Sequence, residues 1–250
     1  MASPRSSQSA DQHVDGEAPK GRSASARTPR QHHREVTERE IVARATAQLA
    51  EVGPTGLSLR KIAREMDLVS SAVYRYFPSR DALLTRLILD GFNDYGRAVE
   101  VAEAEVPREH YGARFRAATG ELRAWALTHP NSYALIYGSP VPGYHAPQET
   151  IAAASRAGIV LMRILEDAQA AGHVFPSASA MHAQGDTVAP LRDTLGPSLE
   201  PGTIALGVDA WSHLMGLVSF ETFGQYRNMI SDTARFYEAA VEDAIASFGL

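Results

Sequence analysis

The apolar residues of this chain recur at helical spacing from about residue 35 onward, and nowhere do they alternate as in a half-buried strand. Proline, glycine and short polar stretches interrupt this pattern and divide it into separate helices. No segment repeats another segment. The pattern therefore predicts an all-α fold, preceded by a long polar stretch.

That polar stretch, residues 1–34, consists mainly of Ser, Ala, Arg, Gln, Pro and Gly. It offers too little apolar surface to offset the entropy of ordering it, so we expect a disordered tail. The end of the tail is basic, with Arg22, Arg27, Arg30 and Arg34. This basic part could form an arm that reaches the minor groove or the phosphates of DNA. A solvated tail without a binding role is the simpler interpretation.

The first predicted helix begins near Thr37, because Thr37-Glu-Arg-Glu40 has the form of a capping box and Val36 could serve as its hydrophobic staple. Gly53 marks its end. Four apolar residues share one face of this helix: Ile41, Ala45, Leu49 and Val52. We expect that face to cover the helices that follow.

Two shorter helices joined by a tight turn are predicted between Leu57 and Arg80. Ser58 is a good N-cap for the first of them, and Asp67 stands at the turn. The second runs from about Val69 to Tyr76, before Pro78 interrupts the pattern. Helices this short cannot bury a core alone. They fit a helix-turn-helix, in which the second helix enters the major groove of DNA.

The same stretch resembles the DNA-binding segment of the TetR family of bacterial transcriptional regulators. The residues that carry the resemblance are Leu59-Arg-Lys-Ile-Ala63, Ala72-Val-Tyr-Arg-Tyr-Phe-Pro-Ser-Arg80 and Asp81-Ala-Leu-Leu84. Two positions depart from the family pattern, since Asp67 replaces the usual Gly of the turn and Val69 replaces the usual Ser or Thr cap. Val69 cannot cap a helix with its side chain, which leaves open whether Ser70 takes over that position.

Candidate DNA contacts follow from this placement. Tyr74 and Arg75 point outward if Val73 and Phe77 point inward, and an outward arginine can bind guanine O6 and N7. Ser70 and Ser71 lie at the N-terminus of the second short helix, where backbone N–H groups favour phosphate binding. The resemblance implies a base or phosphate contact for Arg60. Lys61 and Arg80 are expected to anchor phosphates. The full predicted set is Arg60, Lys61, Ser70, Ser71, Tyr74, Arg75, Tyr76 and Arg80. A solvated polar face is the alternative for Tyr74, Arg75, Arg80 and the two serines.

The remaining pattern predicts a helical body after Ser79, which is a good cap for a long linking helix. The expected helices span residues 80–105, 108–128, 132–137, 150–171, 201–224 and 232–248, the last capped by Ser231, with a short helix near 187–195. The last two long helices are apolar on more than one face. Pairing with the same helices of a second chain would bury the extra face, and TetR-like proteins dimerise in this way. Such a homodimer would read two half-sites of a palindromic operator in double-stranded DNA.

A weaker resemblance links the body to a TetR subgroup named for a Trp-His-Gly motif. It rests on Asn131-Ser-Tyr133, Tyr137-Gly-Ser-Pro-Val-Pro-Gly-Tyr144 and Trp211-Ser-His-Leu-Met-Gly216. Met215 stands directly before Gly216, so no ligand role passes to a histidine there. We expect a pocket for a small-molecule effector between the linking helix and the helices behind it. Its predicted lining is Trp125, Tyr133, Tyr137, Met162, Trp211, His213 and Met215, with ordinary core packing as the alternative for each.

Composition narrows the possible functions. Residues 1–80 hold 13 Lys and Arg against 9 Asp and Glu, whereas residues 81–250 hold 11 against 20. The positive part coincides with the helix-turn-helix, as phosphate binding requires. The chain has no cysteine, which excludes disulfides and thiol catalysis. No apolar signal segment occurs in residues 1–36, and the weakly charged run Thr203–Phe220 suits a buried helix better than a membrane span. We therefore expect a cytoplasmic protein without membrane contact.

These observations predict three parts: a disordered basic tail (1–34), a three-helix DNA-binding domain with a helix-turn-helix (35–80) and a ligand-binding and dimerisation domain (81–250). The expected function is that of a homodimeric repressor released from its operator by a small molecule. An activator or a ligand-free regulator on the same scaffold remains open. Another alternative is a small-molecule-binding or enzymatic helical protein whose helix-turn-helix is only structural. No catalytic, cofactor or metal motif is present, so we expect no enzyme.

Overall fold

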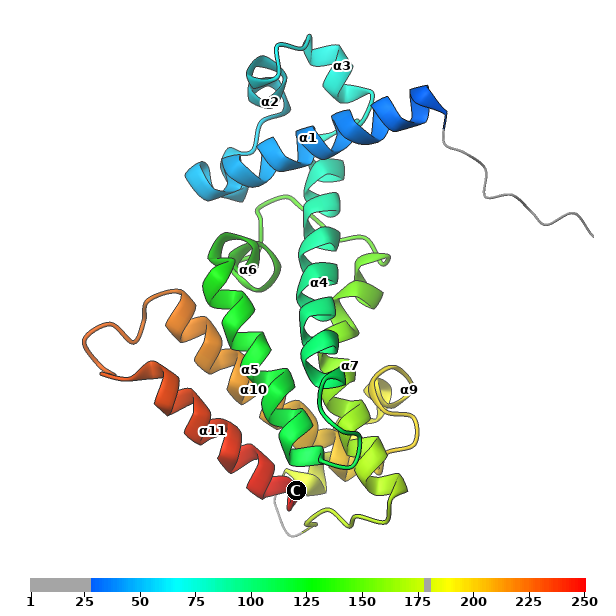
Figure 1. The fold of residues 1–250 in the computed structure, drawn as a ribbon, viewed down its shortest axis with the longest axis vertical. Coiled ribbons are helices and arrows are strands. Elements are labelled where there is room, and N and C mark those ends of the chain that lie inside the picture. Colours follow the sequence, from blue (N-terminus) through cyan, green and yellow to red (C-terminus); the bar gives the residue numbers. More distant parts are fainter. Residues whose placement is uncertain (1–27, 178–180) are drawn as a thin grey trace, which may run out of the picture. The chain divides into compact units, whose positions relative to one another are not determined.

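The computed structural model describes residues 28–177 and 181–250, and every regular element within these ranges is a helix (Figure 1). Residues 38–250 form one compact unit. The long helices are α1 (Pro29–Val52), α4 (Arg80–Ala104), α5 (Tyr111–Thr128), α7 (Thr150–Ala170), α10 (Pro201–Thr222) and α11 (Thr233–Phe248). The shorter ones are η1 (Pro54–Gly56), α2 (Leu59–Glu65), α3 (Ser70–Tyr74), α6 (Pro130–Tyr137), η2 (His182–Gln184), α8 (Gly185–Val188), η3 (Ala189–Leu191) and α9 (Arg192–Leu195). The all-α prediction is confirmed.

Two predicted caps define the ends of the helix-turn-helix region. The Ser58 hydroxyl accepts a hydrogen bond from the backbone N–H of Lys61 (3.3 Å), at the start of α2. The Ser79 hydroxyl accepts from the N–H of Ala82 (3.0 Å), at the start of α4. Each bond satisfies one N–H group that the first helical turn leaves unpaired, which is why both helices begin where the sequence predicts.

One predicted helix start and one predicted cap are wrong. Helix α1 begins at Pro29, not near Thr37, because Thr28 and Gln31 form an earlier capping box in which each side chain accepts from the other residue's N–H (3.3 and 2.9 Å). The Thr37 hydroxyl instead donates to the carbonyl of His33 within the helix. Residues 29–34 therefore do not belong to a disordered tail, and residues 1–27 lie outside the described ranges. Helix α11 is capped by Asp232, whose carboxylate accepts from the N–H of Arg235 (2.9 Å), and not by Ser231.

The remaining boundaries lie close to the predicted ones. Helices α5 and α6 begin within three residues of the expected positions. The short helix expected near 187–195 is divided into α8, η3 and α9. Pro190 stands within η3, and a proline removes the N–H that would continue a helix through this segment.

Buried side chains form two hydrophobic clusters, which we call the head core and the body core. The head core consists of Ile41, Ala45, Leu49, Leu57, Leu59, Ile62, Ala63, Val73, Phe77, Leu83, Leu84, Leu87 and Val141. The body core joins α4, α5, α6, α7, α10 and α11. Helix α4 contributes to both, because its first turns carry Leu83, Leu84 and Leu87, whereas Tyr95 and Val99 lie in the body core.

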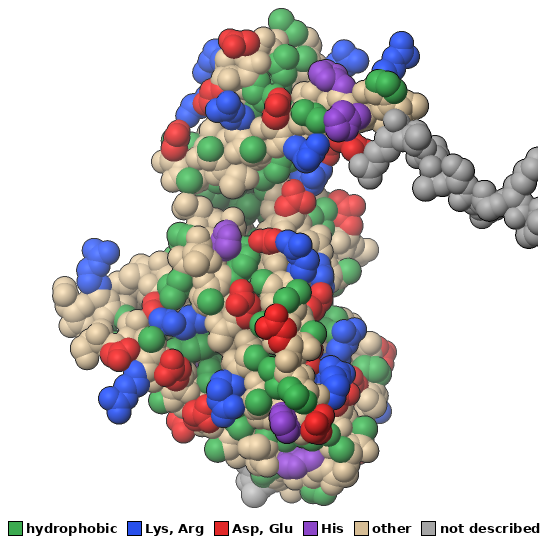
Figure 2. Space-filling view, viewed as in Figure 1, with side chains coloured by type: hydrophobic (Ala, Val, Ile, Leu, Met, Phe, Trp, Pro, Cys, Tyr) green, Lys and Arg blue, Asp and Glu red, His purple; other side chains and the backbone are tan. Residues whose placement is uncertain are grey.

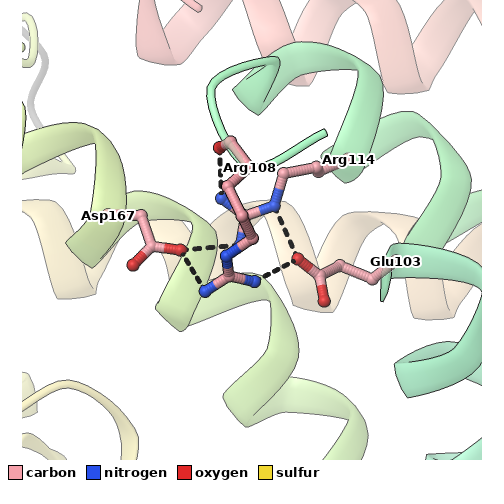
Figure 3. A network of polar contacts seen from close by, with 4 residues as sticks. All are labelled: Glu103, Arg108, Arg114 and Asp167. Atoms are coloured by element: carbon pink, nitrogen blue, oxygen red, sulfur yellow. Dashed lines mark hydrogen bonds and ion pairs between the residues drawn. The ribbon is translucent and has the colours of Figure 1, made fainter. Parts of the chain in front are cut away.

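A buried ionic network fixes the C-terminal end of α4 (Figure 3). The fully buried guanidinium of Arg114 donates from Nε to Glu103 of α4 (2.5 Å) and from Nη2 to Asp167 of α7 (2.7 Å). Its Nη1 donates to the carbonyl of Arg108, whose own guanidinium pairs with the same two carboxylates. A charge buried in this way requires such partners, so the network ties α4, α5 and α7 together.

Among the described residues, α10 is the one helix whose length and mean hydropathy (1.2) would suit a membrane span. In the structure its apolar residues have a different role. Ile204, Leu214 and Val218 are fully buried in the body core. Packing within the bundle therefore accounts for one apolar face of α10, while residues such as Phe220 stay exposed.

Candidate nucleic-acid interface

Helices α2 and α3 are joined by the predicted tight turn. Asp67 adopts a left-handed backbone (φ 53°), which Asp tolerates better than most residues. The N–H groups of Asp67 and Leu68 donate back to Arg64 and Ala63 (3.2 and 2.9 Å), so the carbonyl groups at the end of α2 are satisfied. Val73 of α3 is completely buried in the head core. This anchor leaves the opposite side of α3 free for contact with another molecule.

Five of the predicted DNA contacts lie at the exposed surface of α2 and α3. The side chains of Arg60, Ser70, Ser71, Tyr74 and Arg75 are all exposed. Within the described part of the chain, none of them forms a side-chain hydrogen bond or ion pair. Their donors and acceptors are therefore available to phosphates and base edges.

The other three predicted contacts also make contacts within the protein. Lys61 pairs with Glu51 (3.0 Å) and Glu65 (3.7 Å), and the hydrogen bond that its ammonium group donates to Glu51 raises the pKa of that group. The Arg80 guanidinium donates to the carbonyl of Pro54 in η1 (2.7 Å). Tyr76 is half-buried against the head core. A DNA phosphate would have to share or replace these partners.

The start of α3 lacks a side-chain cap. Val69 occupies the N-cap position, is 72% exposed and forms no cap hydrogen bond, so Ser70 does not take over the position. Replacing Val69 with Thr supplies the missing acceptor, and we expect the protein to gain about 1 kcal/mol of stability. Urea unfolding at fixed protein concentration measures the gain. Val69→Ala is the matched control, and an equal gain in both variants would contradict a capping effect.

In the body, four predicted effector contacts gather around a residue that the sequence reasoning did not select, Tyr95. Its ring lies 5.0 Å from that of Trp125 and 5.6 Å from that of Tyr137. Its hydroxyl donates to the sulfur of Met215 (3.4 Å), and Tyr133 shares a hydrogen bond with Ser219 (2.8 Å). Tyr95 follows the leucine-rich turns of α4 at helical spacing, and this is the signal that could have identified it.

The other three predicted effector contacts lie elsewhere. Met162 is buried in the body core, where its methyl group packs against Gly207. Trp211 is half-buried at the edge of that core. His213 is exposed, because it lies two residues before the inward-facing Met215 and therefore on nearly the opposite side of α10. The structure does not bring His213 to the aromatic cluster.

A cavity of about 460 Å³ opens beside Trp125, between α1, α4, α5, α6 and α7. Its lining is Val42, Thr46, Leu49, Leu87, Asp90, Gly91, Asn93, Asp94, Arg97, Trp125, His129, Ser132, Leu135 and Arg156. Asp94 accepts hydrogen bonds from Trp125 (3.0 Å) and Arg97 (2.8 Å). Burial opposes ionisation, yet these bonds hold the pKa of the Asp94 carboxyl below its usual value. Five apolar side chains and eight polar or charged ones line the cavity, so a small molecule held here would have to form hydrogen bonds as well as apolar contacts.

The face of the body drawn in Figure 2 does not resemble a second nucleic-acid site. On the face drawn in Figure 2, acidic and basic side chains are interspersed over the body. Several of the basic ones are paired, as in the bonds of Arg123 to Glu221 (2.6 and 2.7 Å) and of Arg116 to Glu242 (2.5 and 2.7 Å). In the described ranges, no three His, Asp or Glu side chains gather to hold a metal ion.

Comparison with known proteins identifies the family. Residues 41–87 match the bacterial regulatory proteins of the tetR family, and residues 115–244 match the tetracyclin repressor-like C-terminal domain. The subgroup named for Trp-His-Gly stays a prediction. The HTH-type transcriptional regulator Rv1816 of Mycobacterium tuberculosis is 35% identical over 87% of this chain and 94% of its own length. The same figures hold for Mb1846 of Mycobacterium bovis.

Solved structures agree with this assignment. The crystal structure of SCO4313, described as a regulatory protein, has 35% identity and a TM-score of 0.74, and covers 88% of this chain and 100% of its own. A Rhodococcus protein of unknown function has 27% identity and a TM-score of 0.66, and covers 85% and 95%. With its helix-turn-helix and helical body, the chain belongs to the TetR family of bacterial regulatory proteins and is a DNA-binding transcriptional regulator.

Proposed function

We propose that this protein is a cytoplasmic, homodimeric repressor that binds a palindromic operator and leaves it when a small molecule occupies the body. It acts by binding and carries out no catalysis. The observation that carries the proposal is the exposed side of α2 and α3, where Arg60, Tyr74 and Arg75 have no partner within the described part of the chain. The head core holds these side chains on a rigid support.

The DNA contacts that we propose follow from the chemistry of each side chain. Arg75 binds a guanine edge in the major groove, and Tyr74 contacts a phosphate or a thymine methyl. The N-terminus of α3, with Ser70 and Ser71, faces the backbone of the DNA, while Arg60, Lys61 and Arg80 set the register through phosphates. Tyr76 supports α3 from the half-buried side.

Salt-dependent binding tests this proposal. Fluorescence anisotropy would follow the protein on DNA taken from the region upstream of its own gene. If the dimer contacts at least six phosphates, affinity should fall by about 10³-fold or more between 50 and 200 mM salt. Unrelated DNA of equal length is the control and should bind at least about 10³-fold more weakly at physiological salt. Binding that is absent or independent of salt would favour a small-molecule-binding protein whose helix-turn-helix is only structural.

Exposed aromatic side chains on α10 and α11 support the proposal of a homodimer. Phe220 is 50% exposed and Phe236 47% exposed, and the ring of Tyr226 lies between them at 5.7 and 6.0 Å. Aromatic surface of this kind calls for a covering partner, and a second copy would also supply the second half-site reader. Sedimentation equilibrium should give twice the mass of one chain. Phe236→Glu should yield monomers, whereas Ile151→Glu, at an exposed position on α7, should not. A monomeric parent protein contradicts the proposal.

The effector is proposed to enter the cavity beside Trp125, where α1 of the head meets α4 and α6 of the body. A ligand that binds better when these helices separate would shift the population toward a state with the wrong half-site spacing. Ser132→Trp should fill the cavity and weaken operator binding, whereas Ile151→Trp, outside the cavity, should not. Unchanged operator affinity in a folded Ser132→Trp protein would contradict the proposal that this cavity controls operator binding.

A further inference from the structure

One body segment takes part in the head core. The segment 138–149 connects α6 to α7, and its Val141 is buried among the leucines and isoleucines of the head core. Tyr144 packs against the same cluster, and its hydroxyl forms a hydrogen bond with Thr85 of α4 (2.9 Å). In Figure 1 this segment passes beside the first turns of α4 on its way to α7. Besides the covalent continuation into α4, this segment therefore holds the head through a residue buried in its core.

The segment is stiff around its buried residue. Val141 stands between Pro140 and Pro142, whose rings fix the backbone angle φ on both sides. Gly143 adopts a left-handed backbone (φ 76°), and the N–H of Tyr144 donates to the carbonyl of Val141 (3.1 Å). A stiff turn of this kind transmits displacement instead of absorbing it.

Both ends of the segment are tied to helices that line the cavity. The N–H of Gly138 donates to the carbonyl of Ala134 in α6 (3.0 Å). At the other end, the N–H and hydroxyl of Thr150 in α7 both donate to the carbonyl of Pro147 (3.0 and 2.7 Å). Leu135 of α6 lines the cavity and also packs against the head core. Any change in the spacing of α6 and α7 around the cavity therefore reaches Val141.

We propose that residues 138–149 act as a strut that sets the position of the head on the body, with Val141 and Tyr144 as positioning residues. The proposal rests on the proposed function, because the position of each head determines the spacing of the two half-site readers. The far end of α4 is held by the Arg114 network. The strut therefore acts at the opposite end of α4, whose first turns lie in the head core.

Spin labels can measure the position of the head directly, since the chain has no cysteine of its own. We would place one label at Arg64→Cys on α2 and one at Gly120→Cys on α5, where an added side chain meets open space. Labelled chains are assembled with excess unlabelled chains, so that electron–electron resonance reports distances within one chain only. The parent should give one narrow distance.

In Val141→Ala/Tyr144→Phe, the share of a displaced head position should rise about tenfold or more. The matched control is Val160→Ala/Tyr237→Phe, which removes the same atoms from the body core. It should keep the narrow distance, and Val141→Ile should keep it as well. If the double variant is not folded by circular dichroism, Tyr144→Phe alone decides. A parent-like distance distribution in the folded strut variant would overturn the proposal.

DNA binding distinguishes a role of the strut in positioning the head from an effect on the stability of the head. The strut variant should lose operator affinity by the factor by which the share of dimers with both heads in the parent position falls, while keeping its affinity for unrelated DNA, because each head still contacts phosphates. Equal losses on both DNAs would indicate an unfolded head and overturn the positioning role. If even the parent fails to bind an operator, the proposed function fails, and the spin-label distances still decide whether the strut exists.

Discussion

Replacing Arg114 with Met should cost this protein about 3 kcal/mol of its free energy of unfolding. The guanidinium is fully buried and pairs with Glu103 and Asp167 (Figure 3), so its removal leaves two carboxylates without their main partner. Breaking a buried ion pair costs about 3–5 kcal/mol, and the low end applies because Arg108 keeps its contacts to both carboxylates. Urea unfolding at fixed protein concentration measures the loss.

The matched control lies on the same helix. Arg116 pairs with Glu242 at distances as short as 2.5 Å, but both side chains are half-exposed. Arg116→Met should therefore change the free energy of unfolding by less than about 1 kcal/mol, as is usual for surface pairs. Adding Glu103→Gln and Asp167→Asn to Arg114→Met should restore most of the lost stability. Equal effects of the two Arg→Met replacements would show that burial of the Arg114 network has no energetic consequence.

Replacing Arg75 with Ala should weaken operator binding by about 2–6 kcal/mol, because each bidentate contact to guanine is worth about 1–3 kcal/mol and a dimer loses two. The guanidinium is exposed and has no partner within the described residues, so the stability of the free protein should not change. Anisotropy titrations against operators with single base-pair changes measure the effect. Preference should relax at one base pair of each half-site.

Two arginines serve as comparisons for Arg75. Arg163→Ala, at an exposed position on α7, should leave operator binding unchanged. Arg80→Ala should weaken binding to all sequences alike, both by losing a phosphate contact and by releasing the carbonyl of Pro54. If Arg75→Ala and Arg80→Ala show the same loss at every base pair, Arg75 does not read sequence.

The sequence predicts those parts of the fold that depend on neighbouring residues. Ser58 and Ser79 cap α2 and α4 as expected, since a cap is a bond between residues three positions apart. The start of α1 was missed because two capping boxes compete there, and Thr28-Pro-Arg-Gln31 places a proline at the favoured first position. In the same way, both Ser231 and Asp232 could cap α11, and Asp232 is the residue that forms the capping hydrogen bond.

The site depends more on tertiary packing and was predicted less completely. The exposed side of α3 follows from the inward position of Val73, so Tyr74 and Arg75 were placed correctly. In contrast, no local pattern reveals that Val141 enters the head core or that Arg80 bonds to Pro54. The outward position of His213 was missed because α10 is apolar on more than one face, which leaves its orientation undefined by sequence alone.

Because helix α4 takes part in both cores, it also determines whether the chain can be divided into parts that fold independently. It supplies Leu83, Leu84 and Leu87 to one core and Tyr95 and Val99 to the other. A cut before α4 would take Leu83, Leu84 and Leu87 from the head core, and a cut after α4 would leave Tyr95 and Val99 exposed on the head fragment. Excision of an independently folding DNA-binding fragment should therefore fail, and heat should melt both cores in one cooperative transition.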